Sequence, residues 1–286
     1  MILKNKEEGI KTMKINNLKL IVAMSVLIVS SLFARELASS EVNSRASERV
    51  LNGENLSPGI SVLNINNIAY WIGKDGAYTT AGSPNGTMAD YPIFTGGFIY
   101  SDGMLWGAKV KGDGQGDEVR VGGSTYNHGL KAGRIITDAS GAVLGSDDPI
   151  NNHVWRVRKD WASADLTVDA ANYYAVGTGD VSAAQIAVVK NQYEYDWYNW
   201  PAAWGAPYHD VNGDGSYDPA VDVPGYPGAD QTMWTVANDV PLIVNTAGDS
   251  IGYQSTAPNL YGADPIGIEL QITLWGYAFG ASDPLG

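Results

Sequence analysis

The chain has 286 residues, no cysteine and a formal net charge of −13, from 18 basic and 31 acidic residues. An acidic chain of this kind repels phosphate backbones, which excludes nucleic acid as a partner. Without cysteine it has no disulfides, thiolate metal sites, iron–sulfur clusters or cysteine nucleophile. With 44% hydrophobic residues, the chain is able to bury a sizeable core.

A signal peptide is predicted over residues 1–34. Several lysines precede an uncharged apolar run at 20–34, which ends in small residues just before Arg35. The run is shorter than the roughly 20 residues that a membrane-spanning helix needs. We therefore expect export, with no membrane span after cleavage. Met13 is the more natural start of such a peptide, so residues 1–12 are interpreted as a candidate mis-called extension.

The remaining chain is predicted to be rich in strands. Residues 35–58 are polar and read as a flexible lead-in to a β-rich extracellular region at 59–286. Residues 60–72 are rich in β-branched and aromatic residues, which is typical of a strand. The segment 98–110 predicts two strands joined by a tight turn, a hairpin. Apolar and basic residues alternate at 153–158, which predicts a half-exposed strand.

One substantial helix interrupts this pattern, at about residues 182–199. Ser182 and Gln185 have the spacing of a capping box, and Pro201 ends the pattern. An apolar and aromatic stripe follows at steps of three and four residues, formed by Ile186, Val189, Tyr193, Trp197 and Trp200. We interpret this stripe as core packing in preference to a ligand platform.

The last predicted strand lies at 266–277. Its apolar residues, Ile268, Leu270, Ile272 and Leu274, alternate with polar ones, which predicts one buried and one exposed face. The 34 glycines and 13 prolines predict many turns. The predicted fold is therefore mainly β and β-sandwich-like, with one substantial helix and long Gly/Pro-rich loops.

The strongest candidate site is the segment from Asp210 to Asp222, named here the aspartate loop. Oxygen-bearing side chains at alternate positions, with a glycine at the sixth, are typical of a loop that wraps one calcium ion. The predicted ligands are Asp210, Asn212, Asp214, the Ser216 carbonyl, Asp218 and Asp222. The acidic residue that should occupy position 12, Asp222, comes one residue late, but Pro219 after Asp218 predicts a short helical turn that directs Asp222 inward. No helix-forming run precedes the loop. A helix-free loop of the dockerin kind fits better than a full EF-hand, with structural Ca²⁺ as the expected ligand.

Alternatives to this interpretation stay open. The aspartate loop is also compatible with a plain turn that binds no ion. A second acidic segment at 113–118 lacks the alternating oxygens and is more typical of a hairpin turn. His128, His153 and His209 have no metalloprotease spacing, and no nucleophile elbow or phosphate-binding loop is present. A glycosidase carboxylate pair is compatible with the sequence, because its two members are often far apart along the chain.

The chain also resembles a known family over residues 60 to 286. The resembling segments are 65–68, 105–109, 119–127, 154–161, 200–201, 205–208, 210–218, 228–234 and 266–275. They are similar to the N-terminal region of large secreted bacterial proteins that carry a C-terminal type IX secretion sorting domain. This resemblance implies export, a calcium-type loop at Asp210, Asn212, Asp214 and Asp218, and further domains beyond residue 286, but no assigned activity. The region at 59–286 is therefore expected to be truncated at its C-terminal end.

The sequence thus predicts a secreted or cell-surface structural or interaction protein that is stabilised by a calcium-binding loop and performs no catalysis. Its expected location is extracellular or at the outer cell surface, and its expected partner is an extracellular protein or polysaccharide. The alternative is a carbohydrate-active protein, either a sugar-binding module or a glycoside hydrolase.

Overall fold

The computed structural model describes residues 59–77, 79, 82–83, 85–111, 117–125, 129–254 and 264–278. All of them belong to the second of two units of the chain, residues 46–286. Strands contain 34% of these residues and helices 17%, which confirms the predicted mainly-β class. The predicted signal peptide and lead-in, 1–34 and 35–58, lie outside the described residues. None of the described helices is long and apolar enough to cross a membrane.

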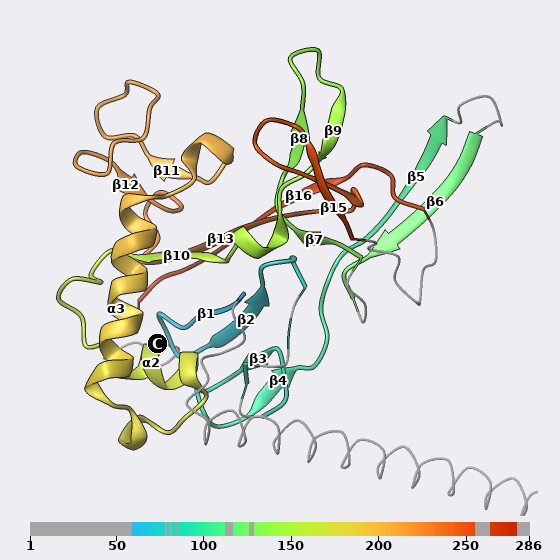
Figure 1. Cartoon of the computed structure of the whole chain (residues 1–286). Helices are drawn as coiled ribbons and strands as arrows, with labels where there is room; N and C mark the ends of the chain where they lie inside the picture. Colours follow the sequence, from blue (N-terminus) through green and yellow to red (C-terminus); the bar gives the residue numbers. More distant parts are fainter. Residues whose placement is uncertain are drawn as a thin grey trace, which may run out of the picture. The chain divides into compact units, whose positions relative to one another are not determined.

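An antiparallel sheet forms the centre of this unit (Figure 1). Its strands are β10 (Trp155–Arg158), β13 (Gln231–Asn238) and β16 (Glu269–Gly276), in that order, and β7 (Lys131–Ala132) pairs with the end of β13. All eight residues of β13 are buried. This strand is buried throughout because it has partner strands on both edges and packed side chains on both faces.

A second sheet packs against one face of the central sheet. Its strands are β1 (Ile60–Leu63), β2 (Ala69–Gly73), β3 (Ala89–Asp90) and β4 (Gly97–Ile99), in that order. Ile72 of this sheet forms a buried cluster with Val154 and Met233, and Leu63, Ile272 and Leu274 pack around it. Two sheets that bury apolar side chains between them form the sandwich-like arrangement that the sequence predicts.

Aromatic residues cover the other face of the central sheet. Trp155 and Trp234 are directly opposite each other on β10 and β13. Together with Val157 and Val236 they pack against Trp200 and Ala206, from the segment after the long helix. The indole Nε1 of Trp200 donates to the carbonyl oxygen of Pro207 at 2.8 Å, so the polar atom of this large side chain is satisfied inside the core.

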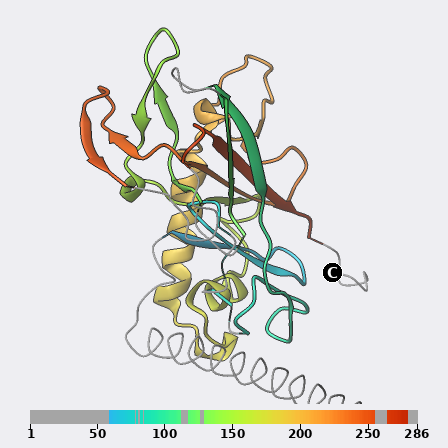
Figure 2. The same ribbon diagram turned by 90° about the vertical axis from the view of Figure 1, so that its right-hand side faces the viewer.

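The longer of two α-helices packs beside β10, and Figures 1 and 2 show it running along this side of the unit. The shorter packs against the longer helix and against β1. The longer, α3 (Ala183–Tyr198), matches the predicted helix, and the predicted capping box between Ser182 and Gln185 is present. The shorter, α2 (Thr167–Tyr174), was not predicted. The helices bury Leu166, Ala170, Tyr174, Val189 and Tyr193 against each other.

The buried face of α3 differs from the predicted stripe. Val189 and Tyr193 are buried as expected, but Ile186 and Trp197 are only partly buried. Asp196 is fully buried instead. Residues 189, 193 and 196 follow one another at steps of four and three, so they lie on one helix face, and this face carries a carboxylate.

The predicted hairpin at 98–110 is wrong. The strand at its start, β4, pairs with β3, whereas β5 (Leu105–Lys111) pairs with β6 (Asp117–Gly123) over seven residue pairs. Seven pairs satisfy far more backbone hydrogen bonds than the three residues of β4 could supply, which favours the observed pairing. Figure 1 shows β5 and β6 as a long ribbon that extends away from β4.

The final strand is less buried than its alternation predicts. Ile268, Leu270, Ile272 and Leu274 are all partly buried. Of the described strands, β13 alone is hydrogen-bonded to β16, so β16 forms an edge of the central sheet. An edge position leaves part of each apolar side chain exposed to solvent.

Smaller elements complete the unit. A third sheet contains β8 (Ile135–Thr137), β9 (Val143–Ser146), β14 (Leu242–Val244) and β15 (Ser250–Tyr253). The 3-10 turns are η1 (Pro149–Asn151), η2 (Thr178–Asp180) and η3 (Ala202–Trp204). The short strands β11 (Tyr208–His209) and β12 (Val223–Pro224) pair with each other and enclose the aspartate loop.

Candidate functional site

The two ends of the aspartate loop are held together by β11 and β12. His209 pairs with Val223 in this antiparallel ladder, so the residues just inside it, Asp210 and Asp222, begin and end one closed loop. A closed loop places oxygen atoms that are twelve residues apart in the sequence near one another. This closure is what the calcium-loop prediction requires.

Asp222 is the buried anchor of the loop, with 2% of its surface exposed. Its Oδ1 accepts the backbone N–H of Val211 at 2.9 Å, and its Oδ2 accepts the backbone N–H of Asp218 at 2.8 Å. The N–H of Asp222 donates to the carbonyl oxygen of Asp218 at 2.7 Å. The sequence predicts this single helical turn after Asp218, and the turn directs Asp222 inward.

Asp210 organises the other end of the loop. Its two carboxylate oxygens accept the backbone N–H groups of Gly213 and Gly215, at 2.7 and 2.8 Å. Both glycines have positive φ, 73° and 77°, a conformation that side chains disfavour. The glycines of the motif are therefore needed to bend the backbone around the Asp210 carboxylate.

The side chains between these anchors are exposed. Asn212 Oδ1 accepts the N–H of Asp214 at 3.1 Å, and Asp214 Oδ1 accepts the N–H of Ser216 at 2.8 Å. Asp218 Oδ1 accepts the N–H of Ala220 at 2.9 Å. Within the described part of the chain, no group of three or more His, Asp or Glu side chains is arranged to hold a metal ion.

Tyr217 connects the loop to α3. Its hydroxyl donates to the carbonyl oxygen of Trp197 at 2.6 Å, and its ring packs edge-on against Tyr208 with centroids 5.4 Å apart. Burial raises the pKa of the Tyr217 hydroxyl, and the carboxylates of Asp222 and Asp218 raise it further. The Tyr217 side chain therefore contacts both the last turn of the long helix and β11 at the start of the loop.

The other predicted candidates are separate from this loop. Most of the acidic segment at 113–118, and His128, lie outside the described residues. His209 is exposed on β11. The Nε2 of His153 is 2.9 Å from Oδ1 of the buried Asp196, and burial raises the pKa of this carboxyl despite the opposing contacts from His153.

The expectation of a half-exposed strand at 153–158 is wrong. Arg156 is buried, with 4% of its surface exposed, and Arg158 is mostly buried. Both guanidinium groups donate to the carboxylate of Asp169 on α2, which also accepts the hydroxyl of Tyr193. The basic face of β10 is buried because α2 supplies a carboxylate for its two cations.

Arg156, Arg158, Asp169 and Tyr193 form a buried polar network, and amide side chains extend it. Arg156 Nη2 donates to Asn64 Oδ1 at 2.7 Å, and Asn64 Nδ2 donates to Asn172 Oδ1 at 2.9 Å. Gln231 Nε2 donates to the Tyr193 hydroxyl at 2.8 Å. The network thus joins the residue that follows β1 with α2, α3, β10 and β13, and it lies between the sheets and the helices.

Sequence reasoning missed this network because its members are far apart in the chain. One local signal was available for Asp196, whose Oδ2 accepts the backbone N–H of Arg156 at 2.8 Å. Asp196 follows Tyr193 by three residues and therefore lies on the apolar face of α3. A carboxylate on such a face predicts a buried partner. Nothing in the spacing of Asp169 and Arg156 indicated that they would meet.

The tryptophans bear on the carbohydrate alternative. Of the nine, Trp71, Trp155, Trp200 and Trp234 are buried in core clusters. Trp275 is 44% exposed and stacks on Tyr226, with ring centroids 4.2 Å apart. Most of the indole surface is therefore used in packing, and Trp275 is the most exposed of these side chains.

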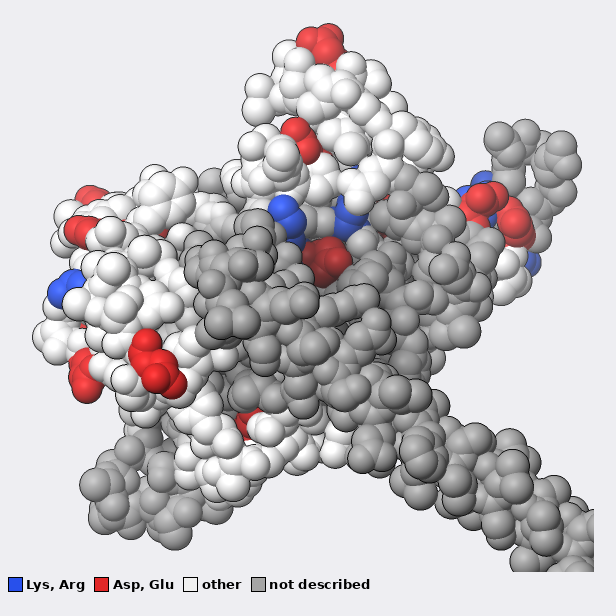
Figure 3. Space-filling view, turned by 60° about the horizontal axis from the view of Figure 1, so that its bottom comes forward, with Lys and Arg blue, Asp and Glu red and all other residues white. Residues whose placement is uncertain are grey.

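Figure 3 shows one face of the molecule, on which Asp and Glu side chains of the described residues are scattered and Lys and Arg gather into no broad patch.

No family model matches the chain, and comparisons with curated proteins and with solved structures found no similar protein.

Proposed function

We propose that the chain is an exported structural or interaction module in which one calcium ion stabilises the aspartate loop. In this proposal Asp210, Asn212, Asp214, the Ser216 carbonyl, Asp218 and Asp222 supply the oxygen ligands, and the chain performs no catalysis. The partner would be an extracellular protein or polysaccharide, at the outer cell surface or in the medium.

The observation that carries the proposal is the charge of the closed loop. Four carboxylates, from Asp210, Asp214, Asp218 and Asp222, lie within 13 residues whose ends are joined by β11 and β12. Among the described residues, no Lys, Arg or His forms an ion pair with any of them. Within the part of the chain that the structure describes, the donors to their oxygens are all N–H groups of the loop itself. Close like charges repel, and a divalent cation relieves that repulsion.

Calcium suits this loop better than magnesium does. Calcium accepts six to eight oxygen ligands in flexible geometry, whereas magnesium prefers a tight octahedron that retains water. The side chains of Asn212, Asp214 and Asp218 are exposed, and in this proposal they exchange the hydrogen bonds that they accept within the loop for contacts to the ion. The proposal therefore includes a rearrangement of these side chains when calcium binds.

Thermal unfolding in calcium and in chelator tests the proposal. If calcium binds the folded state alone, a concentration about 100 times its dissociation constant should stabilise the wild type by about 2.7 kcal/mol. Asp214→Ala should remove most of this increment, because it deletes a ligand and retains both glycines.

Asp138→Ala is the matched control. Asp138 is also an exposed aspartate that accepts hydrogen bonds from its own turn, from Ser140 and Ala142. This variant should keep the full response to calcium. A wild-type melting temperature that is the same in calcium and in chelator would refute the calcium proposal.

The carbohydrate-active alternative is supported by the exposed stack of Trp275 on Tyr226, because sugars pack against exposed aromatic faces. A pull-down with insoluble polysaccharides distinguishes the two. Retention of the wild type and loss of retention in Trp275→Ala would favour the sugar-binding module, and equal passage of both proteins would favour a protein partner.

A further inference from the structure

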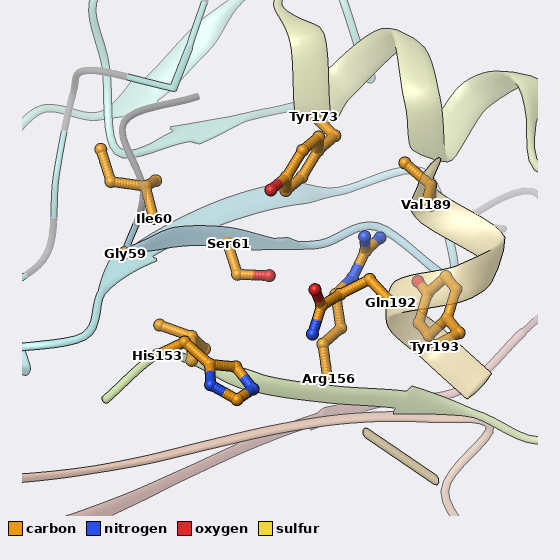
Figure 4. Close-up of a pocket in the computed structure, with 10 residues that line it drawn as sticks. Gly59, Ile60, Ser61, His153, Arg156, Tyr173, Val189, Gln192 and Tyr193 are labelled. Carbon is orange, nitrogen blue, oxygen red and sulfur yellow. The ribbon is translucent and has the colours of Figure 1, made fainter. Parts of the chain in front are cut away.

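A surface hollow of about 520 Å³ lies between α2 and two loops of the second sheet, apart from the aspartate loop. Its lining includes residues 64–67, which follow β1, together with Ile93 and Phe94 between β3 and β4 and Arg158 of β10. Figure 4 shows a smaller cavity beside Arg156, of about 60 Å³, which has room for two water molecules at roughly 30 Å³ each. Ligand sites commonly have volumes of roughly 300–1,000 Å³, so of these two spaces the hollow has the size of a ligand site.

Phe94 has an unusual backbone conformation for a residue of its size. Its φ is 65°, in the left-handed region that bulky side chains rarely adopt, and a glycine would fit there with less strain. The neighbouring Ile93 packs against a buried cluster of the second sheet, but Phe94 is 37% exposed and lines the hollow. Core packing therefore explains this aromatic residue only in part. Backbone strain of this kind is found where a side chain has a function, which makes the Phe94 ring a candidate contact for a ligand.

Three polar side chains of the lining have hydrogen-bonding atoms to offer. Asp165 Oδ1 accepts the backbone N–H and the hydroxyl of Thr167, at 3.0 and 2.6 Å, and no described residue donates to its Oδ2. The side-chain amide of Asn67 and the hydroxyl of Thr178 form no hydrogen bond with any residue in the described part of the chain. The hollow therefore offers a carboxylate acceptor, and an amide and a hydroxyl that both donate and accept.

The charges of the hollow favour a neutral ligand. Arg158 is paired with Asp169 at 2.6 Å and with Asp160 at 2.7 Å, so its charge is already balanced. Asp165 forms no ion pair with a described cation. An anionic ligand would be repelled by the Asp165 carboxylate. A cationic ligand would gain little from one exposed carboxylate, because solvent screens such a pair.

Sugars match this combination of groups. Each hydroxyl of a sugar both donates and accepts hydrogen bonds, and the C–H face of a sugar ring buries apolar surface against an aromatic ring. Ile93 and Val168 extend the apolar part of the lining beside Phe94. A peptide matches less well, because extended peptides typically pair with a strand edge and this lining comes mainly from loops and the start of a helix.

We propose that this hollow binds a neutral oligosaccharide. One sugar ring packs against the ring of Phe94, and its hydroxyls form hydrogen bonds with Asp165 Oδ2, the Asn67 amide and the Thr178 hydroxyl. This inference rests on the proposed role as an interaction module, and it narrows the partner of that module to a polysaccharide.

Titration with short oligosaccharides tests the proposal. Cellotriose, xylotriose, maltotriose and N-acetylchitotriose are added in turn to the folded protein while the methyl NMR signals of Ile65, Ile93 and Val168 are followed. At least one of these neutral sugars should give saturable shifts, and anionic trigalacturonic acid should bind about tenfold or more weakly than that sugar. No saturable shift with any neutral sugar, or tighter binding of trigalacturonic acid or of acetylated and amidated trialanine, would overturn the assignment.

Two substitutions of Phe94 separate its role in binding from its role in the fold. Phe94→Ala and Phe94→Gly both remove the ring, so each should weaken binding of the sugar about tenfold or more. Phe94→Gly should melt at a higher temperature than Phe94→Ala, because glycine adopts a positive φ without strain. Phe98→Ala is the matched control, since Phe98 is 50% exposed on β4 and lies outside the lining of the hollow. Equal weakening of binding by Phe94→Ala and Phe98→Ala would contradict the proposed site.

Two further variants distinguish this proposal from those made above. Trp275→Ala should leave the titration unchanged, and loss of binding in this variant with full binding in Phe94→Gly would place the sugar at the Trp275 and Tyr226 stack instead. Asp214→Ala should also leave the titration unchanged. Calcium stabilisation and sugar binding therefore fail separately, because each has its own variant and its own measurement.

Discussion

The carboxylate of Asp222 accepts the backbone N–H of Val211 across the aspartate loop, at 2.9 Å, and so joins the end of the loop to its beginning. Asp222→Ala removes this acceptor and also leaves the N–H of Asp218 unpaired. In calcium-free buffer we expect it to lower the free energy of unfolding by about 1–3 kcal/mol. Urea denaturation measures this change. Asp249→Ala, at an exposed aspartate of another turn, should cost much less, and equal losses would show that Asp222 does not anchor the loop.

Arg156 is expected to be essential for stability. Arg156→Met leaves the buried carboxylate of Asp169 with Arg158 as its one cationic partner among the described residues. Removing one member of a buried ion pair should lower the free energy of unfolding by about 3 kcal/mol. Lys159→Met provides the comparison, because the ammonium group of Lys159 lies 3.6 Å from Asp230 and both side chains are more than one-third exposed. Its loss should stay below about 1 kcal/mol. Similar losses in the two variants, measured by chemical denaturation, would contradict the buried network.

Lys131 should make stability depend on alkaline pH. Burial lowers the pKa of this lysine to about 8, although the carboxylate of Asp239 acts in the opposite direction. Between pH 8 and the ordinary lysine pKa of 10.5, the unfolded chain binds more protons than the folded one. Stability from this group therefore rises with pH through that window. Lys131→Met removes the contribution, so its stability relative to wild type should fall by up to about 3 kcal/mol from pH 8 to 10.5. Parallel pH profiles of the two proteins would refute this expectation.

Export leads to a prediction about the mature N-terminus. If residues 1–34 are a signal peptide, protein recovered outside the cytoplasm should begin between about Ser31 and Ser39, where small residues allow cleavage. N-terminal sequencing of the exported protein measures this directly. A soluble cytoplasmic product that retains Met1 or Met13 would contradict it.

The sequence alone predicted features that depend on neighbouring residues. The capping box at Ser182 and Gln185 and the helical spacing after it correctly predicted α3, because both depend on contacts within one turn of helix. The turn that directs Asp222 inward was predicted from Asp218 and its proline for the same reason. Alternation at 266–277 predicted a strand, since side chains alternate between the two faces of any strand.

Tertiary structure decided which elements meet. The residue pattern of β5 does not indicate which strand it pairs with. It pairs with β6 because that ladder is longer than one with β4 would be. The sequence predicts that the basic residues of β10 face solvent. Arg156 is buried instead, because Asp169 on α2 forms an ion pair with it. A cavity beside Arg156 is likewise lined by side chains from four elements, β1, β10, α2 and α3. Local periodicity specifies which face of an element is polar, but only packing determines whether that face contacts water or a buried opposite charge.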